Sequence, residues 1–206
     1  MNITLTGNLG SGKTNICNIL EKEVGFEIIK SGELFREIAN ERKISVVELN
    51  ELAKSDKSID TMLDERSKVL GDIKTDSVFD SRMGWFFVSD SFKVFLLVEI
   101  KEAAKRVLND KSRKAEFYKD ITEAETGIIT RSKMERSRFK ELYNVDYYNQ
   151  KNYNLIIDTT NATADEVADT ILNQYCEFKK SPFDSKIIFL NKTKIDKSNY
   201  YFDFAD

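Results

Sequence analysis

The sequence predicts an α/β fold in which a five-stranded parallel sheet is covered by helices on both faces. Short apolar runs alternate with longer segments of helical periodicity, as expected where each strand returns to the sheet through a helix. The runs are apolar at most positions, which is typical of strands that are buried on both faces. A glycine-rich turn also joins the first run directly to a helical segment.

Five runs have the length and composition of buried strands. They cover residues 2–6, 26–30, 77–80, 93–98 and 154–158. A helix over 12–24 follows the first run, because apolar residues recur there at helical spacing and Gly25 ends the pattern. The last helical segment, 163–176, begins with Thr163 and Glu166 in the arrangement of a capping box.

Two long segments do not fit this alternation of strands and helices. Residues 31–72 contain several helical patterns, residues 110–150 are rich in charged side chains, and neither segment contains a strand. Both are too long to be ordinary connections, and long inserts at the carboxyl edge of a parallel sheet often cover a ligand. We therefore expect a domain over residues 1–178, in which 31–72 is an acceptor-binding insert and 110–150 is a lid.

The remaining residues, 179–206, form a C-terminal extension. Pro182, the only proline of the chain, marks its beginning. Residues 187–190 resemble a strand and residues 200–202 are aromatic. The extension could add a strand, cover an apolar patch or join a partner, and the sequence does not distinguish among these roles.

Residues 7–14, Gly-Asn-Leu-Gly-Ser-Gly-Lys-Thr, match the P-loop pattern G-x-x-x-x-G-K-[ST] and lie between a strand and a helix. The glycines let the backbone curl so that successive N–H groups and the start of the helix point at a triphosphate. Lys13 supplies a cation to the outer phosphates, and the Thr14 hydroxyl can bind Mg²⁺. The predicted nucleotide-binding residues are Gly7, Gly10, Ser11, Gly12, Lys13 and Thr14.

Composition excludes several other classes of function. The chain has no histidine, which excludes histidine-based triads and most zinc sites. A net charge of −3 gives no reason to expect nucleic acid or an anionic membrane as a partner. Cys17 and Cys176 are far apart and suit buried thiols in a reducing cytosol. Without a signal peptide or a membrane-spanning run, we expect a cytoplasmic monomer or homodimer that binds small molecules.

A second group of residues lies where a phosphate acceptor would bind. Ser31 is suited to cap the helix after the second strand, and Arg36 lies one turn into that helix. Asp80 ends the third strand, where its carboxylate can hold a magnesium-bound water near Thr14, and Arg82 would face the acceptor phosphate. One such arginine is often a solvated surface residue, but two that follow strand ends beside a P-loop favour a binding role.

The charged segment 110–150 contains Arg131, Glu135 and Arg138, which fall on one face of a helix, and Arg136, which points elsewhere. One interpretation is a solvated helix with ion pairs along its surface. The other is a lid that brings cations over the transferring phosphate when it closes.

These segments resemble the cytidylate kinase family, notably its short archaeal-type branch. The resemblance is carried by residues 7–14, 31–36, 90–96 and 157–160 and by Arg131, Glu135 and Arg138. It extends over residues 1–175 and implies a P-loop kinase fold, ATP as donor and CMP or dCMP as acceptor. It also implies that Ser31 and Arg36 bind the acceptor and that the lid arginines contact the transferring phosphate. Ser81 departs from the family's usual glycine and could crowd the acceptor phosphate.

We therefore predict in-line phosphoryl transfer from ATP to a nucleoside monophosphate. The acceptor is already an anion, so the catalytic task is to hold two polyanions together and to neutralise charge on the transferring group. The predicted catalytic residues are Lys13, Arg82, Arg131 and Arg138. The acceptor is assigned to Ser31, Arg36 and Arg82, and Mg²⁺ to Thr14 and Asp80.

Other functions stay open on the sequence. A P-loop kinase can act on another small acceptor, such as AMP, shikimate or dephospho-coenzyme A, and a catalytically silent nucleotide-binding protein is a further alternative. Residues 193–196 resemble the guanine-reading pattern [NT]-K-x-D of GTP-binding switches, but no D-x-x-G pattern follows the third strand. Asp60 could accept a hydrogen bond from the amine of cytosine. An exposed helix carboxylate is the commoner role for Asp60, and a core position the commoner role for Trp85.

Overall fold

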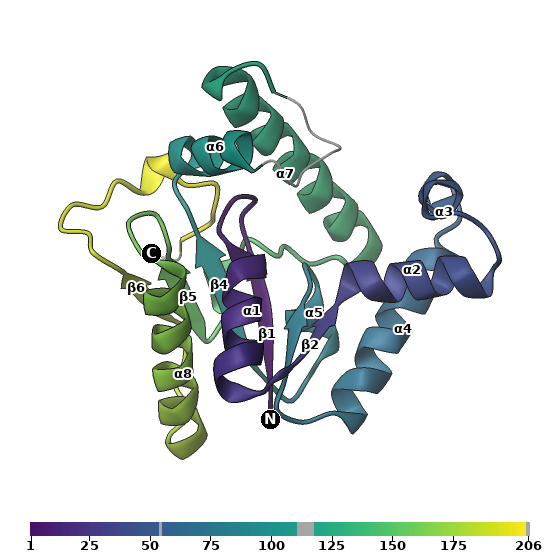
Figure 1. The fold of residues 1–206 in the computed structure, drawn as a ribbon, viewed down its shortest axis with the longest axis horizontal. Coiled ribbons are helices and arrows are strands. Elements are labelled where there is room, and N and C mark those ends of the chain that lie inside the picture. Colours follow the sequence, from purple (N-terminus) through teal and green to yellow (C-terminus); the bar gives the residue numbers. More distant parts are fainter. Residues whose placement is uncertain (54, 111–117, 205–206) are drawn as a thin grey trace.

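A six-stranded parallel sheet forms the centre of the computed structural model, which describes residues 1–53, 55–110 and 118–204 (Figure 1). The strand order is β2-β3-β1-β4-β5-β6, so β1 lies between β3 and β4. The strands are β1 (Asn2–Gly7), β2 (Glu27–Lys30), β3 (Ser77–Asp80), β4 (Ser91–Leu97), β5 (Leu155–Asp158) and β6 (Lys186–Phe189). The predicted α/β class and all five predicted strands are confirmed.

The sheet has one strand more than predicted. β6 comes from the C-terminal extension and pairs in parallel with β5, with Leu155 opposite Lys186. Its side chains are half-buried or exposed, as expected at the edge of a sheet. A run of four residues at an edge gives only a short apolar signal, which is why the sequence left its role open.

Helices connect the strands and build the two long inserts. They are α1 (Lys13–Val24), α2 (Ser31–Glu41), α3 (Val46–Ala53), α4 (Ser58–Ile73), α5 (Gly84–Phe87), α6 (Ile100–Asn109), α7 (Ile121–Tyr143) and α8 (Ala164–Lys180), with short 3₁₀ turns at Gln150–Asn152 and Lys197–Asn199. The capping box of Thr163 and Glu166 is present at the start of α8. Residues 111–117 of the predicted lid lie outside the described residues.

Alternate residues of β4 build two separate cores. Val94 and Leu96 pack in one core with α1 and α8, which lie on the same face of the sheet in Figure 1. Phe95 faces the opposite side and packs in an aromatic core with Trp85 and with Phe202 from the C-terminal extension. The extension therefore covers an apolar patch as well as adding a strand, and Trp85 is a core residue.

Two local expectations are wrong. Ser31 is the first residue of α2 and not its cap, and its hydroxyl instead donates to the Asp80 carbonyl at 3.3 Å. Cys176 is exposed, because Tyr175 takes the buried position on that turn of α8, whereas Cys17 is buried as expected. Within the described residues, no helix combines the length and apolarity needed to cross a bilayer.

Candidate active site

The P-loop lies between β1 and α1 and curls around a cavity of about 350 Å³. Gly10 and Gly12 adopt left-handed backbone angles, with φ of +78° and +87°. A side chain at Gly10 would also come within 2.9 Å of the Ala103 backbone on α6. Glycine is therefore required at Gly10 both by conformation and by space. Residues 8–15 line the cavity together with Arg106, Val107 and Asp110.

The polar groups of this loop suit a phosphate. The Ser11 Oγ and Asn8 Oδ1 atoms are buried and have no hydrogen-bond partner among the residues that the structure describes. Buried polar atoms of this kind normally find a partner, so the loop has capacity for a ligand or water. The space beside Gly12 is also open, since a Cβ there would meet nothing within 4 Å. The loop thus offers both open space and polar atoms of the kind that bind phosphate groups.

Lys13 begins α1, and the pKa of its ammonium group is lowered. Burial and the nearby Arg82 guanidinium lower the pKa of Lys13 from 10.5 to about 7, against the opposing charge of Asp80. Asp80 ends β3 opposite Leu5 of β1, which places its carboxylate beside the P-loop. Thr14 is exposed at the start of α1. The Thr14 hydroxyl and the Asp80 carboxylate supply the oxygen ligands that Mg²⁺ prefers.

Arg82 connects the P-loop to α7. Its Nη1 donates to the Gly7 carbonyl at 2.8 Å, and its Nε donates to Glu135 at 2.9 Å. Glu135 also accepts from Arg131 Nε at 2.9 Å. Burial alone would raise the pKa of Glu135, but the charges of Arg82 and Arg131 hold it below its usual value. The carboxylate thus keeps two cations in place beside the P-loop.

A second cavity, of about 560 Å³, adjoins Arg82 and lies between the 31–72 insert and α7. Three of the predicted site residues, Ser31, Arg82 and Arg138, line it. Ser81 lines it too, and its hydroxyl accepts from the Met83 N–H at 3.2 Å. The serine in place of the family's glycine therefore forms part of the turn into α5.

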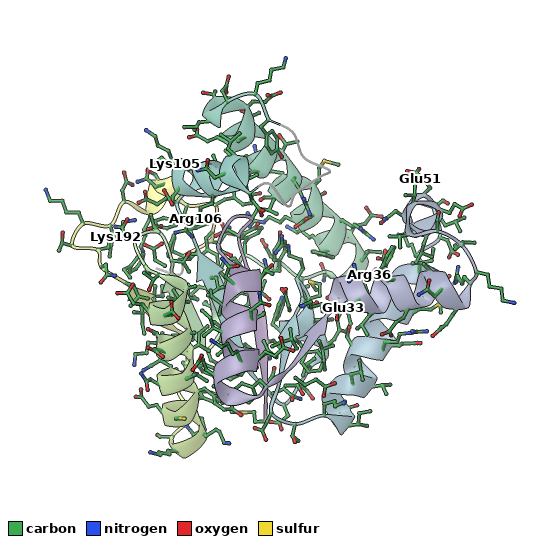
Figure 2. All side chains as sticks on the ribbon, viewed as in Figure 1. Glu33, Arg36, Glu51, Lys105, Arg106 and Lys192 are labelled. Carbon is green, nitrogen blue, oxygen red and sulfur yellow. The ribbon has the colours of Figure 1, made fainter. Side chains whose placement is uncertain are left out.

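Arg36 is not among the residues that line this cavity. Its side chain is 58% exposed and lies 3.8 Å from Glu33 of the same helix, and Figure 2 labels both residues on α2. Arg131 does not line the second cavity either, and its side chain pairs with Glu135. The structure therefore brings Lys13, Asp80, Arg82 and Glu135 together, while Arg36 and Arg131 lie at the margin of the site.

Two carboxylates in the second cavity were missed or underrated by the sequence analysis. Asp60 is 16% exposed and binds Arg138 Nη2 at 2.6 Å, so it is not the exposed helix carboxylate that was expected. Asp64 accepts from the Tyr143 hydroxyl. Burial raises the pKa of Asp64 to about 6, although this hydrogen bond opposes the rise. The signal was the four-residue spacing of Asp60 and Asp64, which places both on one face of α4.

Arg106 of α6 is a further residue that the sequence analysis did not identify. Its guanidinium donates to the Gly10 carbonyl at 3.3 Å and to the Thr159 and Thr160 carbonyls at 2.7 and 3.1 Å. Figure 2 shows Arg106 beside the P-loop turn. Thr159 Oγ1 lies 3.2 Å from the Ser11 carbonyl. Arg106 and Thr159 thus connect the P-loop to the segment that follows β5.

Comparisons with known proteins agree with this geometry. Residues 2–161 match the model of the cytidylate kinase-like family. A cytidylate kinase of Methanocella arvoryzae is 32% identical over 181 residues, which cover 88% of this chain and 100% of that protein. A cytidylate kinase of Archaeoglobus fulgidus is 28% identical over 90% of this chain and 100% of that protein.

Two further matches are a much longer protein and a solved structure of low sequence identity. An S-adenosylmethionine-dependent nucleotide dehydratase of Lacinutrix mariniflava is 34% identical over 92% of this chain, but this chain spans only 38% of the length of that protein. The structure of a shikimate kinase from Bacteroides thetaiotaomicron superimposes with a TM-score of 0.60, covering 86% of this chain and 98% of that one at 16% identity. At that identity the likeness concerns the fold alone.

Proposed function

The chain belongs to the cytidylate kinase-like family, and from this we propose that it transfers the γ-phosphoryl group of ATP to a nucleoside monophosphate, CMP or dCMP. The family and the fold support nucleotide kinase activity as the class of chemistry. One observation carries the proposal furthest. Arg82 binds the Gly7 carbonyl of the P-loop and also lines the second cavity, so a donor in one cavity and an acceptor in the other would meet at a single cation.

The donor phosphates are assigned to the P-loop cavity. The backbone of residues 8–13 and the Lys13 ammonium would hold the outer phosphates, and Ser11 would find the partner that its buried hydroxyl lacks within the described residues. Thr14 and Asp80 would hold Mg²⁺, which when bound neutralises charge on the phosphates. Phosphate charge would also favour the protonated form of Lys13.

Arg82, Arg131 and Arg138 are the cations that would neutralise charge spreading over the transferring group. In the structure each of them binds a carboxylate, Glu135 or Asp60. Acceptor and donor phosphates would compete with these carboxylates for the guanidinium groups, which form two parallel bonds with either anion. The acceptor is already anionic and reacts without a strong base, so positioning and charge neutralisation are the main catalytic contributions.

The base of the acceptor is assigned to the α4 side of the second cavity. Asp60 and Asp64 present carboxylate oxygens there, and the exocyclic amine of cytosine donates hydrogen bonds to such groups. The 4-oxo group of uracil has no proton to donate. Two carboxylates at this position therefore support a preference for cytosine over uracil.

The test is to incubate the protein with Mg-ATP and each of CMP, dCMP, UMP, AMP, GMP, shikimate and dephospho-coenzyme A, and to measure the ADP formed. We expect the highest kcat/KM with CMP or dCMP. Turnover with shikimate or dephospho-coenzyme A alone would contradict the monophosphate assignment. Absence of turnover with every acceptor, with ATP still bound, would favour a silent nucleotide-binding protein.

Replacement of Lys13 by alanine tests the donor site directly. The loss of its charge at the phosphates should lower kcat by at least about 100-fold, because charge neutralisation by one positioned group commonly contributes that much. Lys194→Ala, an exposed lysine of the C-terminal extension, is the matched control and should keep wild-type turnover. Near-normal turnover in a folded Lys13→Ala protein contradicts the assignment.

A further inference from the structure

We propose that residues 200–204, near the end of the C-terminal extension, form a strap that fixes the P-loop and α7 relative to each other, and that Tyr201 and Asp203 are positioning residues for phosphoryl transfer. This inference rests on the proposed function for its kinetic consequence. The match to the family model ends at residue 161, so the strap lies beyond it.

The first observation is a direct contact between the strap and the P-loop. Asn8 is 5% exposed, and its side-chain amide donates to the Tyr201 carbonyl at 3.0 Å. The contact uses the backbone of the strap, so it depends on where the strap lies more than on which side chain Tyr201 carries. A shift of the strap would leave the buried amide of Asn8 without this partner.

The second observation is that the same strap holds α7. The Arg136 guanidinium lies 5.7 and 5.9 Å from the ring centroids of Tyr148 and Tyr201, which contact each other edge to face. Its Nε donates to Asp146 at 2.9 Å, and its guanidinium also binds Asp203. The Asp203 N–H donates to the Tyr148 carbonyl at 3.0 Å. An arginine that contacts two aromatic rings and binds two carboxylates is held in one orientation.

The third observation is that the strap is itself anchored to the sheet. The Tyr200 hydroxyl donates to Asp158, the last residue of β5, at 2.9 Å, and Lys192 donates to the Tyr200 oxygen at 2.7 Å. Phe202 packs against Phe95 of β4 with ring centroids 4.7 Å apart. Figure 2 shows Lys192 near Arg106 at this edge of the sheet. Because the strap is fixed to the sheet, its contacts can set the position of α7.

The position of α7 matters because Arg136 follows Glu135 in the same helix. Glu135 holds Arg82 and Arg131, two of the cations assigned to the transferring phosphate. A small displacement of α7 would therefore move these cations, together with the wall of the acceptor cavity that α7 forms. Misplacement of catalytic groups by about 1 Å can cost about 100-fold in rate.

The experiment compares Asp203→Asn with Asp184→Asn, an exposed aspartate of the same extension. We expect Asp203→Asn to lower kcat about 10-fold, and the KM of the acceptor to rise as well, because α7 forms one wall of the acceptor cavity. Hydrogen exchange should become faster at the amides of residues 8–13 and 134–143, while the denaturant midpoint stays at the control value. In an Arg136→Met background, Asp203→Asn should have no further effect on kcat.

Wild-type kcat and unchanged exchange in Asp203→Asn overturn the proposal. A lower denaturant midpoint with unchanged kcat also overturns it, because that result describes a purely structural role. If the wild-type protein phosphorylates no nucleoside monophosphate, the proposed function fails but the strap is still tested. In that case faster exchange at both the P-loop and α7 supports the strap, and unchanged exchange rejects it.

Discussion

At the scale of single residues, the charge state of Lys13 has a measurable consequence. Its pKa of about 7 means that the free protein carries a partly neutral amine at neutral pH. Bound phosphates favour the ammonium form, so nucleotide binding should take up a proton. Below pH 7 the Lys13 amine is mostly protonated before ATP binds. Above pH 7 it is mostly neutral, so the binding of ATP is coupled to the uptake of a proton.

We therefore predict that the dissociation constant of ATP increases above pH 7, by up to about 10-fold per pH unit. Calorimetry in two buffers of different ionisation enthalpy measures the proton uptake directly. The uptake should approach one proton near pH 8.5 and disappear in Lys13→Met. A dissociation constant that stays level between pH 7 and 8.5 contradicts the assignment of Lys13 to the phosphates.

Asp60 and Asp64 give a second prediction at this scale. If their carboxylates accept from the cytosine amine, then Asp60→Asn and Asp64→Asn should lower kcat/KM for CMP by about 10- to 100-fold, as expected when a hydrogen bond to a charged group is lost. The value for UMP should change much less. Glu65→Gln, an exposed carboxylate of α4 outside the lining of this cavity, is the matched control. Equal losses with both acceptors would assign these carboxylates a structural role.

At the scale of elements, α7 and α4 interact across the second cavity. Lys57 lies 3.2 Å from Glu141, Arg138 binds Asp60, and the Tyr143 hydroxyl binds Asp64. The helix that carries Arg131 and Arg138, the cations proposed to act in transfer, is thereby attached to the helix proposed to read the base. Arg138 and Tyr143 of α7 bind the two carboxylates assigned to the base, so a movement of α7 would also change the proposed base site.

The Tyr143–Asp64 hydrogen bond makes this link testable. Burial raises the pKa of Asp64 to about 6, and the tyrosine hydroxyl opposes that rise, so Tyr143→Phe should raise the pKa further. Because the ionised carboxylate accepts from the cytosine amine more strongly than the neutral acid does, the acid limb of kcat/KM for CMP should move to higher pH in Tyr143→Phe. A pH profile from 5 to 8 with CMP and UMP measures this, and the UMP profile serves as the control.

The sequence predicted the elements around the P-loop well and those of the extension poorly. Residues 2–6 and 7–14 carry their own signals, because a run of apolar and β-branched residues directly precedes a phosphate loop that needs glycines at set positions. β6 and the buried rings of Tyr200 and Phe202 depend on contacts with β5 and β4, which are distant in sequence. Local pattern contains no information on such contacts.

The residues of the candidate site were predicted from local sequence signals at strand ends, and residues whose position depends on distant contacts were not. Lys13, Arg82 and Asp80 follow strand ends, and parallel strands bring such ends to one edge of the sheet. Arg36 fulfils the motif but lies outside the cavity, because its side chain extends along the exposed face of α2 toward Glu33. Arg106 could not be recognised, because its role depends on how α6 packs against the P-loop and the segment after β5.

At the scale of the whole molecule, a buried charge connects the extension to the rest of the chain. Asp158 is fully buried, and its carboxylate accepts from Tyr200 at 2.9 Å and lies 3.4 Å from Lys192 Nζ. Lys192 is also bound by Glu99, and its side chain is only 10% exposed. Asp158 precedes the C-terminal extension in the sequence, but its counter-ion, Lys192, comes from that extension.

We predict that Lys192→Met lowers the free energy of unfolding by about 3 kcal/mol, because it removes the counter-ion of a buried carboxylate and leaves that carboxylate with its hydrogen bonds from Tyr200 and Thr160. Lys194→Met makes the same change at an exposed position of the same segment and should alter stability by less than about 0.5 kcal/mol. Urea unfolding of both variants provides the comparison. Equal stability of the two would show that the extension does not stabilise Asp158.

The hydrogen bond from Asn8 to the Tyr201 carbonyl joins two residues that are 193 positions apart. A ribosome adds residues in order from the amino-terminal side, so the P-loop is made well before its partner. At ordinary elongation rates the interval is roughly 10 to 40 s. During that time the buried amide of Asn8 lacks this partner. This contact with the P-loop therefore forms only after the chain has been extended through residue 201, and a chain terminated before that residue lacks it.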